Sequence, residues 1–327
     1  MNPARMDGAL ALAEGGADQQ EHEEFRDAVL SGLARPRKAI PSTYFYDAEG
    51  SRLFERICEL EEYYPTRTEI GILRDNAGAI AAALPERSLL VEFGSGASVK
   101  VRLLLDALDR PAGYVPIDIS REHLLASAAA LAADYPDIAV LPVCADFTRT
   151  FRLPRALPEC PRVGFFPGST IGNFHPHEAV RLLAGFAARL GRGGRLLIGA
   201  DLKKDERILH AAYDDAQGVT AAFNRNLLVR INRELGGTFD PAAFAHRAVY
   251  DARTGRVEMH LVSSSAHSVR VAGRTFRFAA GETIHTENSY KYSVEDFHAI
   301  AAAAGWRPEA VWIDPAQLFS VHLLAVE

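Results

Sequence analysis

The sequence has few features of an extracellular or membrane protein. Only three cysteines occur in 327 residues, and Cys58, Cys144 and Cys160 show no CxxC spacing. Their odd number favours a reducing compartment over a disulfide framework. No run approaches the roughly 18 apolar residues of a transmembrane helix, and the amino terminus lacks the basic-then-apolar order of a secretory signal. We therefore expect a cytoplasmic protein without a membrane partner.

The sequence also lacks any block of positive charge. The formal net charge is −6, so no lysine or arginine cluster offers a surface to a polyanion. His175 and His177 form an HxH pattern, but no acidic or cysteine partner stands at a recurrent metal-ligand spacing. We expect no metal and no nucleic-acid partner, and a monomer that acts on a small molecule.

From about residue 88, short apolar runs alternate with longer helical patterns, as in parallel βαβ units. Acidic residues near the start of a segment at 293–304 indicate a capped helix. The pattern as a whole predicts an α/β fold with a Rossmann-like, doubly wound sheet. The predicted strands are 88–93, 114–119, 138–144, 163–166, 195–200, 310–313 and 319–326.

The βαβ pattern is interrupted between the fifth and sixth of these strands. A helical stretch at 203–235 is followed by alternating residues at 249–278, with turns at Thr254-Gly255 and Ala272-Gly273. Alternation of this kind around short turns predicts antiparallel hairpins. A different architecture is therefore inserted into the sheet.

These patterns predict two lobes and a leader. The inserted lobe is an α+β substrate-binding domain, the sheet is the catalytic domain, and a cleft between them is the expected ligand site. The leader is expected to be mobile because it shows no sustained apolar period. The predicted bounds are 1–22 for the leader, 23–67 with 203–292 for the substrate domain, and 68–202 with 293–327 for the catalytic domain.

The first predicted strand ends in the glycine-rich turn Glu92-Phe93-Gly94-Ser95-Gly96. Glycines at this position let a ligand approach the backbone at the carboxyl end of a strand, where open α/β sheets bind ligands. A dinucleotide fingerprint requires a third glycine at the position of Val99. Its absence weakens the interpretation as a pyrophosphate site.

Polar residues also follow the next two strands. Asp118 stands where a carboxylate can accept hydrogen bonds from both hydroxyls of a ribose, although an aspartate at a strand end also serves as a cap or turn residue. Asp146 can accept from an adenine amino group while Phe147 stacks on its ring. Of three successive strand ends, the first would thus form the glycine-rich turn, the second would bind the ribose of a nucleoside and the third would bind its base.

After the fourth strand, Asn173 offers two donors and an acceptor for an amine or a carboxylate, or alternatively forms an Asx turn. Several long motifs, spread over about residues 35–327, resemble the histidine-specific Nα-methyltransferases of ergothioneine biosynthesis. They are Tyr44-Phe45-Tyr46-Asp47, Glu62-Tyr63-Tyr64-Pro65-Thr66-Arg67-Thr68-Glu69, the turn from Glu92 to Gly96, Gly168-Ser169-Thr170-Ile171-Gly172-Asn173-Phe174, Tyr213-Asp214-Asp215-Ala216-Gln217-Gly218-Val219-Thr220 and His285-Thr286-Glu287-Asn288-Ser289.

The resemblance implies a Rossmann-like class I methyltransferase and assigns ligand contacts position by position. Lys100 would pair with the methionyl carboxylate of S-adenosylmethionine, Glu287 and Ser289 would hydrogen-bond an imidazole ring, and Met259 would pack beside it. The implied cofactor-binding residues are Glu92, Gly94, Lys100, Asp118, Asp146, Phe147 and Gly168. The implied substrate-binding residues are Tyr63, Asn173, Tyr213, Met259, Glu287, Asn288 and Ser289.

By this resemblance, the expected reaction is three successive methyl transfers from S-adenosylmethionine to the α-amine of L-histidine. The trimethylated product is hercynine. Tyr46 and Asn173 are the candidate catalytic residues, with the Tyr46 hydroxyl near the amine. Alternatives are a methyltransferase of another amino acid or an indole-bearing amine, a nicotinamide-dependent oxidoreductase, and a non-catalytic binding module on the same fold.

Overall fold

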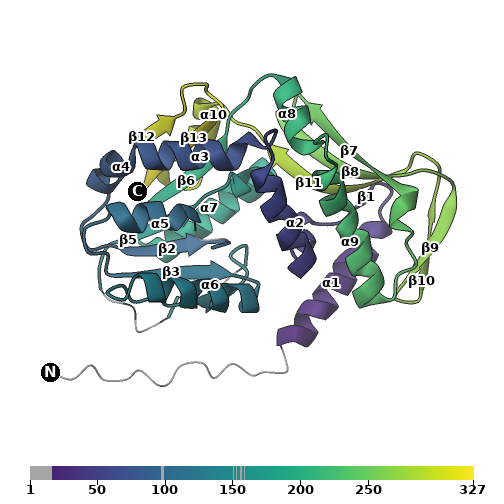
Figure 1. Ribbon diagram of the computed structural model, residues 1–327, viewed down its shortest axis with the longest axis horizontal. Coiled ribbons are helices and arrows are strands. Elements are labelled where there is room, and N and C mark those ends of the chain that lie inside the picture. Colours follow the sequence, from purple (N-terminus) through teal and green to yellow (C-terminus); the bar gives the residue numbers. More distant parts are fainter. Residues whose placement is uncertain (1–16, 97–98, 150, 152, 155–156, 158) are drawn as a thin grey trace.

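Two lobes lie side by side in the computed structural model (Figure 1). The structure describes residues 17–327 apart from 97–98, 150, 152, 155–156 and 158, so residues 1–16 of the leader predicted at 1–22 lie outside the described residues. One lobe is built on a seven-stranded sheet and the other on a four-stranded sheet. No helix among the described residues is long and apolar enough to cross a membrane.

The seven-stranded sheet has the order β12-β13-β6-β5-β2-β3-β4. β2 to β6 run parallel, whereas β13 is antiparallel to both of its neighbours. The strand order reverses direction at β2, which confirms the predicted doubly wound α/β sheet. The strands are β2 (Leu89–Phe93), β3 (Gly113–Asp118), β4 (Val143–Cys144), β5 (Arg162–Phe166), β6 (Arg195–Asp201), β12 (Trp306–Ile313) and β13 (Phe319–Val326).

Helices cover both faces of this sheet and bury its apolar strands. One core cluster joins α3, α4 and α5 to the sheet, and another joins α7 and α10 to its opposite face. Parallel strands covered on both sides are continuously apolar, as in Leu89-Leu90-Val91. The helices of this lobe are α3 (Tyr64–Asp75), α4 (Ala77–Ala83), α5 (Val99–Ala107), α6 (Arg121–Asp134), α7 (Pro176–Leu190) and α10 (Val294–Ala303), with the 3₁₀ helix η2 (Thr170–Asn173).

The second lobe combines the inserted region with a segment near the start of the chain. A single hydrophobic cluster contains side chains from residues 25–64 and from 209–284. Its strands are β1 (Lys38–Ala39), β7 (Phe244–Asp251), β8 (Arg256–Ser263), β9 (His267–Val271), β10 (Arg274–Phe278) and β11 (Thr283–Tyr290). Its helices are α1 (Ala17–Leu33), α2 (Ala48–Glu59), α8 (Glu206–Tyr213) and α9 (Val219–Leu235), with η1 (Ser42–Phe45) and η3 (Pro241–Ala243).

The predicted hairpins of this lobe are confirmed. β7 pairs with β8, and β9 pairs with β10, in antiparallel register. The turn between β9 and β10 has φ values of 45° at Ala272 and 78° at Gly273. Two successive residues with positive φ match the right-handed twist of the flanking strands, as hairpin turns require.

The predicted strand at 138–144 is wrong over most of its length. Only Val143 and Cys144 form a strand, while Val140 makes an isolated bridge to Tyr114. Pro142 stands just before β4 and has no N–H to donate to the ladder. An apolar run therefore did not suffice to define this edge strand.

Three helix and strand boundaries also differ from the predictions. α1 begins at Ala17, so residues 17–22 of the predicted leader are helical. The helical stretch at 203–235 is two helices, because the side chain of Asp215 accepts hydrogen bonds from the amides of Val219 and Thr220 and starts α9 anew. β12 begins at Trp306 and is longer than predicted.

Candidate active site

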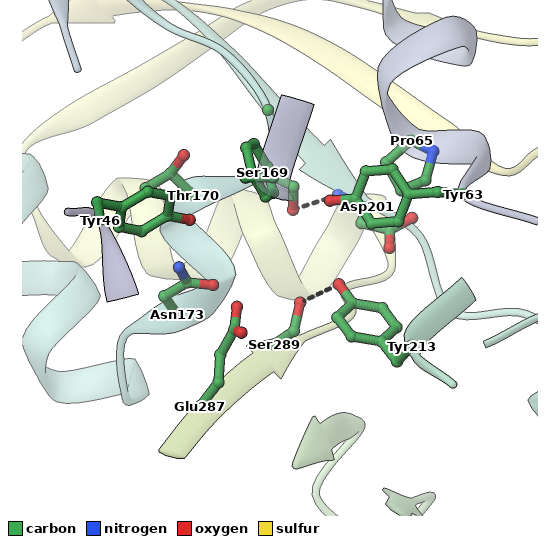
Figure 2. Close-up of a pocket in the computed structure, with 12 residues that line it drawn as sticks. Tyr46, Tyr63, Pro65, Ser169, Thr170, Asn173, Asp201, Tyr213, Glu287 and Ser289 are labelled. Carbon is green, nitrogen blue, oxygen red and sulfur yellow. Dashed lines mark hydrogen bonds between the residues drawn. The ribbon is translucent and has the colours of Figure 1, made fainter. Parts of the chain in front are cut away.

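A cavity lies where the carboxyl ends of β5 and β6 meet β11 and α8 of the other lobe. Six side chains that were predicted to bind substrate or act in catalysis line it together, and Figure 2 shows them gathered around one space. The predicted lining residues are Tyr46, Tyr63, Asn173, Tyr213, Glu287 and Ser289, with Gly168 from the predicted cofactor set. The others are Phe54, Pro65, Ser169, Thr170 and Asp201.

Asn173 reaches the cavity because the chain makes a close turn after β5. Gly168 has φ 84° and Ser169 has φ 58°, so the backbone adopts left-handed conformations before η2 begins. A Cβ on Gly172 would lie 2.7 Å from the carbonyl oxygen of Tyr290. A glycine is therefore required for η2 to approach β11, and this approach brings Asn173 and Glu287 to the same cavity.

Ser289 and Tyr213 belong to a buried hydrogen-bond network beside the cavity. Their hydroxyl oxygens lie 2.7 Å apart, as the dashed line in Figure 2 marks. The ammonium group of Lys291 donates to both oxygens at 2.8 Å and forms an ion pair with Asp201 at 2.6 Å. Sequence analysis missed Lys291 and Asp201, although Asp201 ends a parallel strand and Lys291 follows a recognised motif by two residues.

Two ion pairs allow Asp201 to be charged inside the protein. Burial alone would raise the pKa of Asp201, but Lys291 and Lys204 together hold this pKa below its ordinary value. Burial lowers the pKa of Lys204 to about 8, against the opposing effect of Asp201. The Tyr64 hydroxyl donates to Asp201 at 2.7 Å, which completes the network away from the cavity.

Glu287 carries a perturbed carboxyl group that lines the cavity. Burial raises its pKa to about 7, and Lys291 acts in the opposite direction. Burial of the Tyr46 hydroxyl raises the pKa of this phenol above its ordinary value, and the charge of Glu287 adds to the effect. Tyr46 is thus a neutral hydroxyl at physiological pH, able to accept or donate a hydrogen bond but unsuited to act as a phenolate base.

Two predicted substrate contacts lie outside the cavity. Asn288 sits between Glu287 and Ser289 on β11, so alternation along the strand directs it to the other face, where its Oδ1 lies 3.1 Å from Nε2 of His285. The prediction for Asn288 is therefore corrected. Met259 pairs with Glu287 across β8 and β11 but is 2% exposed in the core of its lobe, and it does not line the cavity.

The predicted nucleoside site lies at the carboxyl ends of β2, β3 and β4. Gly94 has φ 78°, and a Cβ there would approach the Phe147 ring to 3.3 Å. The carboxylate of Asp118 accepts from the Ser120 amide at 2.9 Å and remains partly exposed. Asp146 accepts from the Thr148 amide at 2.8 Å. The structure thus brings these residues to one edge of the sheet.

Lys100 links this edge to the cavity. Its ammonium group forms a 2.5 Å ion pair with Glu69, which is fully buried and accepts hydrogen bonds from the Gly168 amide. Glu69 was not predicted as a site residue. It holds Lys100 next to Gly168, where a Cβ would lie 3.5 Å from the ammonium nitrogen.

Glu92 differs from the other predicted cofactor residues. It is 2% exposed and its carboxyl accepts a hydrogen bond from the Tyr114 hydroxyl. Burial raises the pKa of Glu92 to about 8, against the effect of that hydrogen bond. The carboxyl of Glu92 is thus buried against Tyr114, and its role in cofactor binding stays a prediction.

No metal centre is found among the described residues. No three histidine, cysteine, aspartate or glutamate side chains in that part of the chain lie close enough together to hold an ion. His175 and His177 have rings 6.0 Å apart, and the first contacts the Tyr290 hydroxyl at 2.9 Å.

Comparison with known proteins identifies the family. The family model described as "Histidine-specific methyltransferase, SAM-dependent" matches residues 25–326. The chain belongs to this family. It is 43% identical to histidine N-alpha-methyltransferase of Mycolicibacterium smegmatis, over 96% of this chain and 98% of that protein.

Two further relatives agree with this assignment. Histidine N-alpha-methyltransferase of Mycobacterium tuberculosis is 42% identical over 97% of this chain and 99% of its own length. Ergothioneine biosynthesis protein 1 of Neurospora crassa is 31% identical over 90% of this chain, which spans 34% of that longer protein. The similarity to the mycobacterial proteins extends across both lobes.

The residues at the sheet edge fit S-adenosylmethionine, the methyl donor of the family. Gly94 has a positive φ and carries no side chain, and the Phe147 ring packs against this turn. Asp118 presents a partly exposed carboxylate at the end of the neighbouring strand. The Lys100 ammonium group places a positive charge beside Gly168 at this edge.

Proposed function

We propose that the protein transfers three methyl groups from S-adenosylmethionine to the α-amine of L-histidine and releases hercynine for ergothioneine biosynthesis. The observation that carries this proposal is the meeting of Glu287, Ser289, Tyr213 and Asn173 in one cavity. Glu287 and Ser289 are two residues apart on β11 and project from the same face. We propose that a flat ring with a polar atom on two sides lies between them.

The other end of the cavity suits the α-amino acid group. Asn173 has two donors and one acceptor for the carboxylate and the amine, and Tyr63 and Tyr213 line the same space with ring centroids 6.3 Å apart. Tyr46 comes from the other side with its neutral hydroxyl. We propose that Tyr46 and Asn173 hold the amine with its lone pair directed toward the nucleoside edge.

The sulfonium of bound S-adenosylmethionine supplies an already activated methyl group. The protein then has to align an uncharged amine and exclude water, because positioning is the main requirement of such a transfer. An α-amine has a pKa of about 8 in peptides and a higher one in free amino acids, so it must lose a proton before attack. The hydroxyl and amide groups around it can orient the uncharged form by hydrogen bonds without contributing a charged base.

We propose that the nucleoside and methionyl parts of the donor are bound by Gly94, Lys100, Asp118, Asp146, Phe147 and Gly168. We also propose that the enzyme needs no metal and works as a cytoplasmic monomer, since its three cysteines show no CxxC spacing and residues of one chain line the proposed cavity. Light scattering of the purified protein tests the monomer, and activity after dialysis against a chelator tests the independence from metals.

Competing substrates test the assignment to histidine. We expect methylation of L-histidine at a far higher kcat/KM than of L-tryptophan, because an indole has no ring nitrogen to accept a hydrogen bond and leaves a buried polar group unpaired. A preference for tryptophan would support the indole alternative. Stabilisation by NADH, with none by S-adenosylhomocysteine, would instead support a nicotinamide-dependent oxidoreductase.

A further inference from the structure

Lys291 is a fully buried cation that adjoins the cavity without lining it. Its side chain has 0% exposed surface and its three protons have three acceptors, Asp201 at 2.6 Å and the hydroxyl oxygens of Tyr213 and Ser289 at 2.8 Å. Burial would lower the pKa of Lys291, but Asp201 and Tyr213 raise it above the ordinary value. Lys291 is therefore charged and can only donate hydrogen bonds.

This geometry restricts what the two hydroxyl groups can offer to a ligand. Tyr213 and Ser289 each accept from Lys291, and their mutual 2.7 Å hydrogen bond consumes one of their two protons. One proton remains for the cavity. If Tyr213 donates to Ser289, the serine oxygen already accepts two hydrogen bonds and can only donate to a substrate.

The opposite direction would make Ser289 an acceptor beside Glu287. A ring placed between two acceptors would have to be an imidazolium, with a proton on each nitrogen. The Lys291 ammonium, 2.8 Å from the serine oxygen, opposes a second positive charge at this place. The network therefore favours the arrangement in which Ser289 donates and Glu287 accepts.

We propose that Lys291 is a positioning residue that makes Ser289 a hydrogen-bond donor and thereby selects the neutral imidazole ring of the substrate, protonated on the nitrogen that faces Glu287. This inference rests on the proposed function and adds to it a residue that does not touch the substrate.

The protonation state of the bound ring tests the proposal in the unmodified enzyme. Nitrogen NMR of L-histidine labelled in the ring is recorded with enzyme and S-adenosylhomocysteine between about pH 6 and 8, around the imidazole pKa. We expect one protonated and one unprotonated nitrogen throughout. Two protonated nitrogens would overturn the proposal. The ionisable groups that face this region are Tyr46, Tyr63, Asp201, Lys204, Tyr213, Glu287 and Lys291.

Two variants separate this role from a structural one. Lys291→Met should increase the ratio of imidazolium to neutral imidazole in the bound substrate about tenfold or more, because the substitution removes a nearby positive charge. Lys204→Met is the matched control, because Lys204 also pairs with Asp201, at 2.5 Å, but contacts neither Tyr213 nor Ser289. Equal behaviour of the two variants would overturn the proposal. If Lys291→Met does not fold, the measurement on the unmodified enzyme still decides.

Coupling between Lys291 and Ser289 gives a second readout. Ser289→Ala should weaken histidine binding about tenfold in the unmodified enzyme, because the ring nitrogen loses its donor. The same substitution should weaken histidine binding clearly less in the Lys291→Met background, where the serine hydroxyl is free to rotate. An equal loss in both backgrounds would overturn the proposal. Absence of histidine methylation by the unmodified enzyme would instead contradict the proposed function itself.

Discussion

Replacing Glu287 by glutamine should make the ligand-free enzyme more stable while weakening histidine binding. Burial raises the pKa of Glu287 from 4.5 to about 7, so the folded protein resists ionisation of this group. Each pKa unit corresponds to about 1.4 kcal/mol, so ionisation of Glu287 costs about 3 kcal/mol of folding free energy above pH 7. A neutral glutamine avoids this cost.

The pH dependence follows from the sign of the shift. Below about pH 4.5 the carboxyl is protonated in both the folded and the unfolded chain, so it contributes no difference. Between that pH and about 7 the unfolded chain ionises first, and the unmodified protein loses stability relative to Glu287→Gln. Chemical denaturation at about pH 5 and pH 8 should therefore show a larger advantage of the variant at the higher pH.

Calorimetry measures the functional cost of the same change. A hydrogen bond to a charged group contributes about 1.5–3 kcal/mol, which predicts a 10- to 150-fold weaker Kd for histidine with S-adenosylhomocysteine present. Glu258→Gln is the control, because Arg256 and His260 contact this carboxylate and it does not line the cavity. It should leave histidine affinity unchanged and should not stabilise the protein. A Glu287→Gln variant that binds histidine normally would refute our account of the cavity.

Two other changes address the nucleoside edge and the turn after β5. Asp118→Ala should weaken binding of S-adenosylhomocysteine by roughly 10- to 100-fold in calorimetry, through loss of a charged hydrogen-bond acceptor, while thermal stability changes little; unchanged affinity would exclude Asp118 from the site. Gly172→Ala should lower kcat and thermal stability together, because its Cβ would lie 2.7 Å from the carbonyl oxygen of Tyr290; wild-type values of both would show that η2 can shift without consequence.

Much of the catalytic lobe was predictable because its signals are local. Apolar runs predicted the central strands, and the capped helix predicted at 293–304 matches α10, where Ser293 and Asp296 form a capping box. The prediction of an edge strand at 138–144 was wrong over most of its length. Pro142 cannot donate a hydrogen bond to the ladder, although the residues around it are apolar. The split between α8 and α9 depends on one aspartate side chain, which an apolar period does not reveal.

The site was predictable in its ligand-facing residues but not in the groups behind them. Glu287 and Ser289 lie in a recognisable motif, whereas Lys291, Asp201 and Glu69 gain their importance only from contacts made by folding. Asp201 and Lys291 are 90 positions apart in sequence yet form a 2.6 Å ion pair. Asn288 was misassigned because membership of a motif does not show which face of a strand a side chain takes.

The most direct test of the account is mass spectrometry of the product formed from L-histidine and S-adenosylmethionine by the purified enzyme. The account predicts three successive increases of one methylene mass each, ending in the trimethylated betaine with the ring nitrogens unmodified. A product methylated on the imidazole ring, or no product from an enzyme shown to bind S-adenosylhomocysteine, would contradict it.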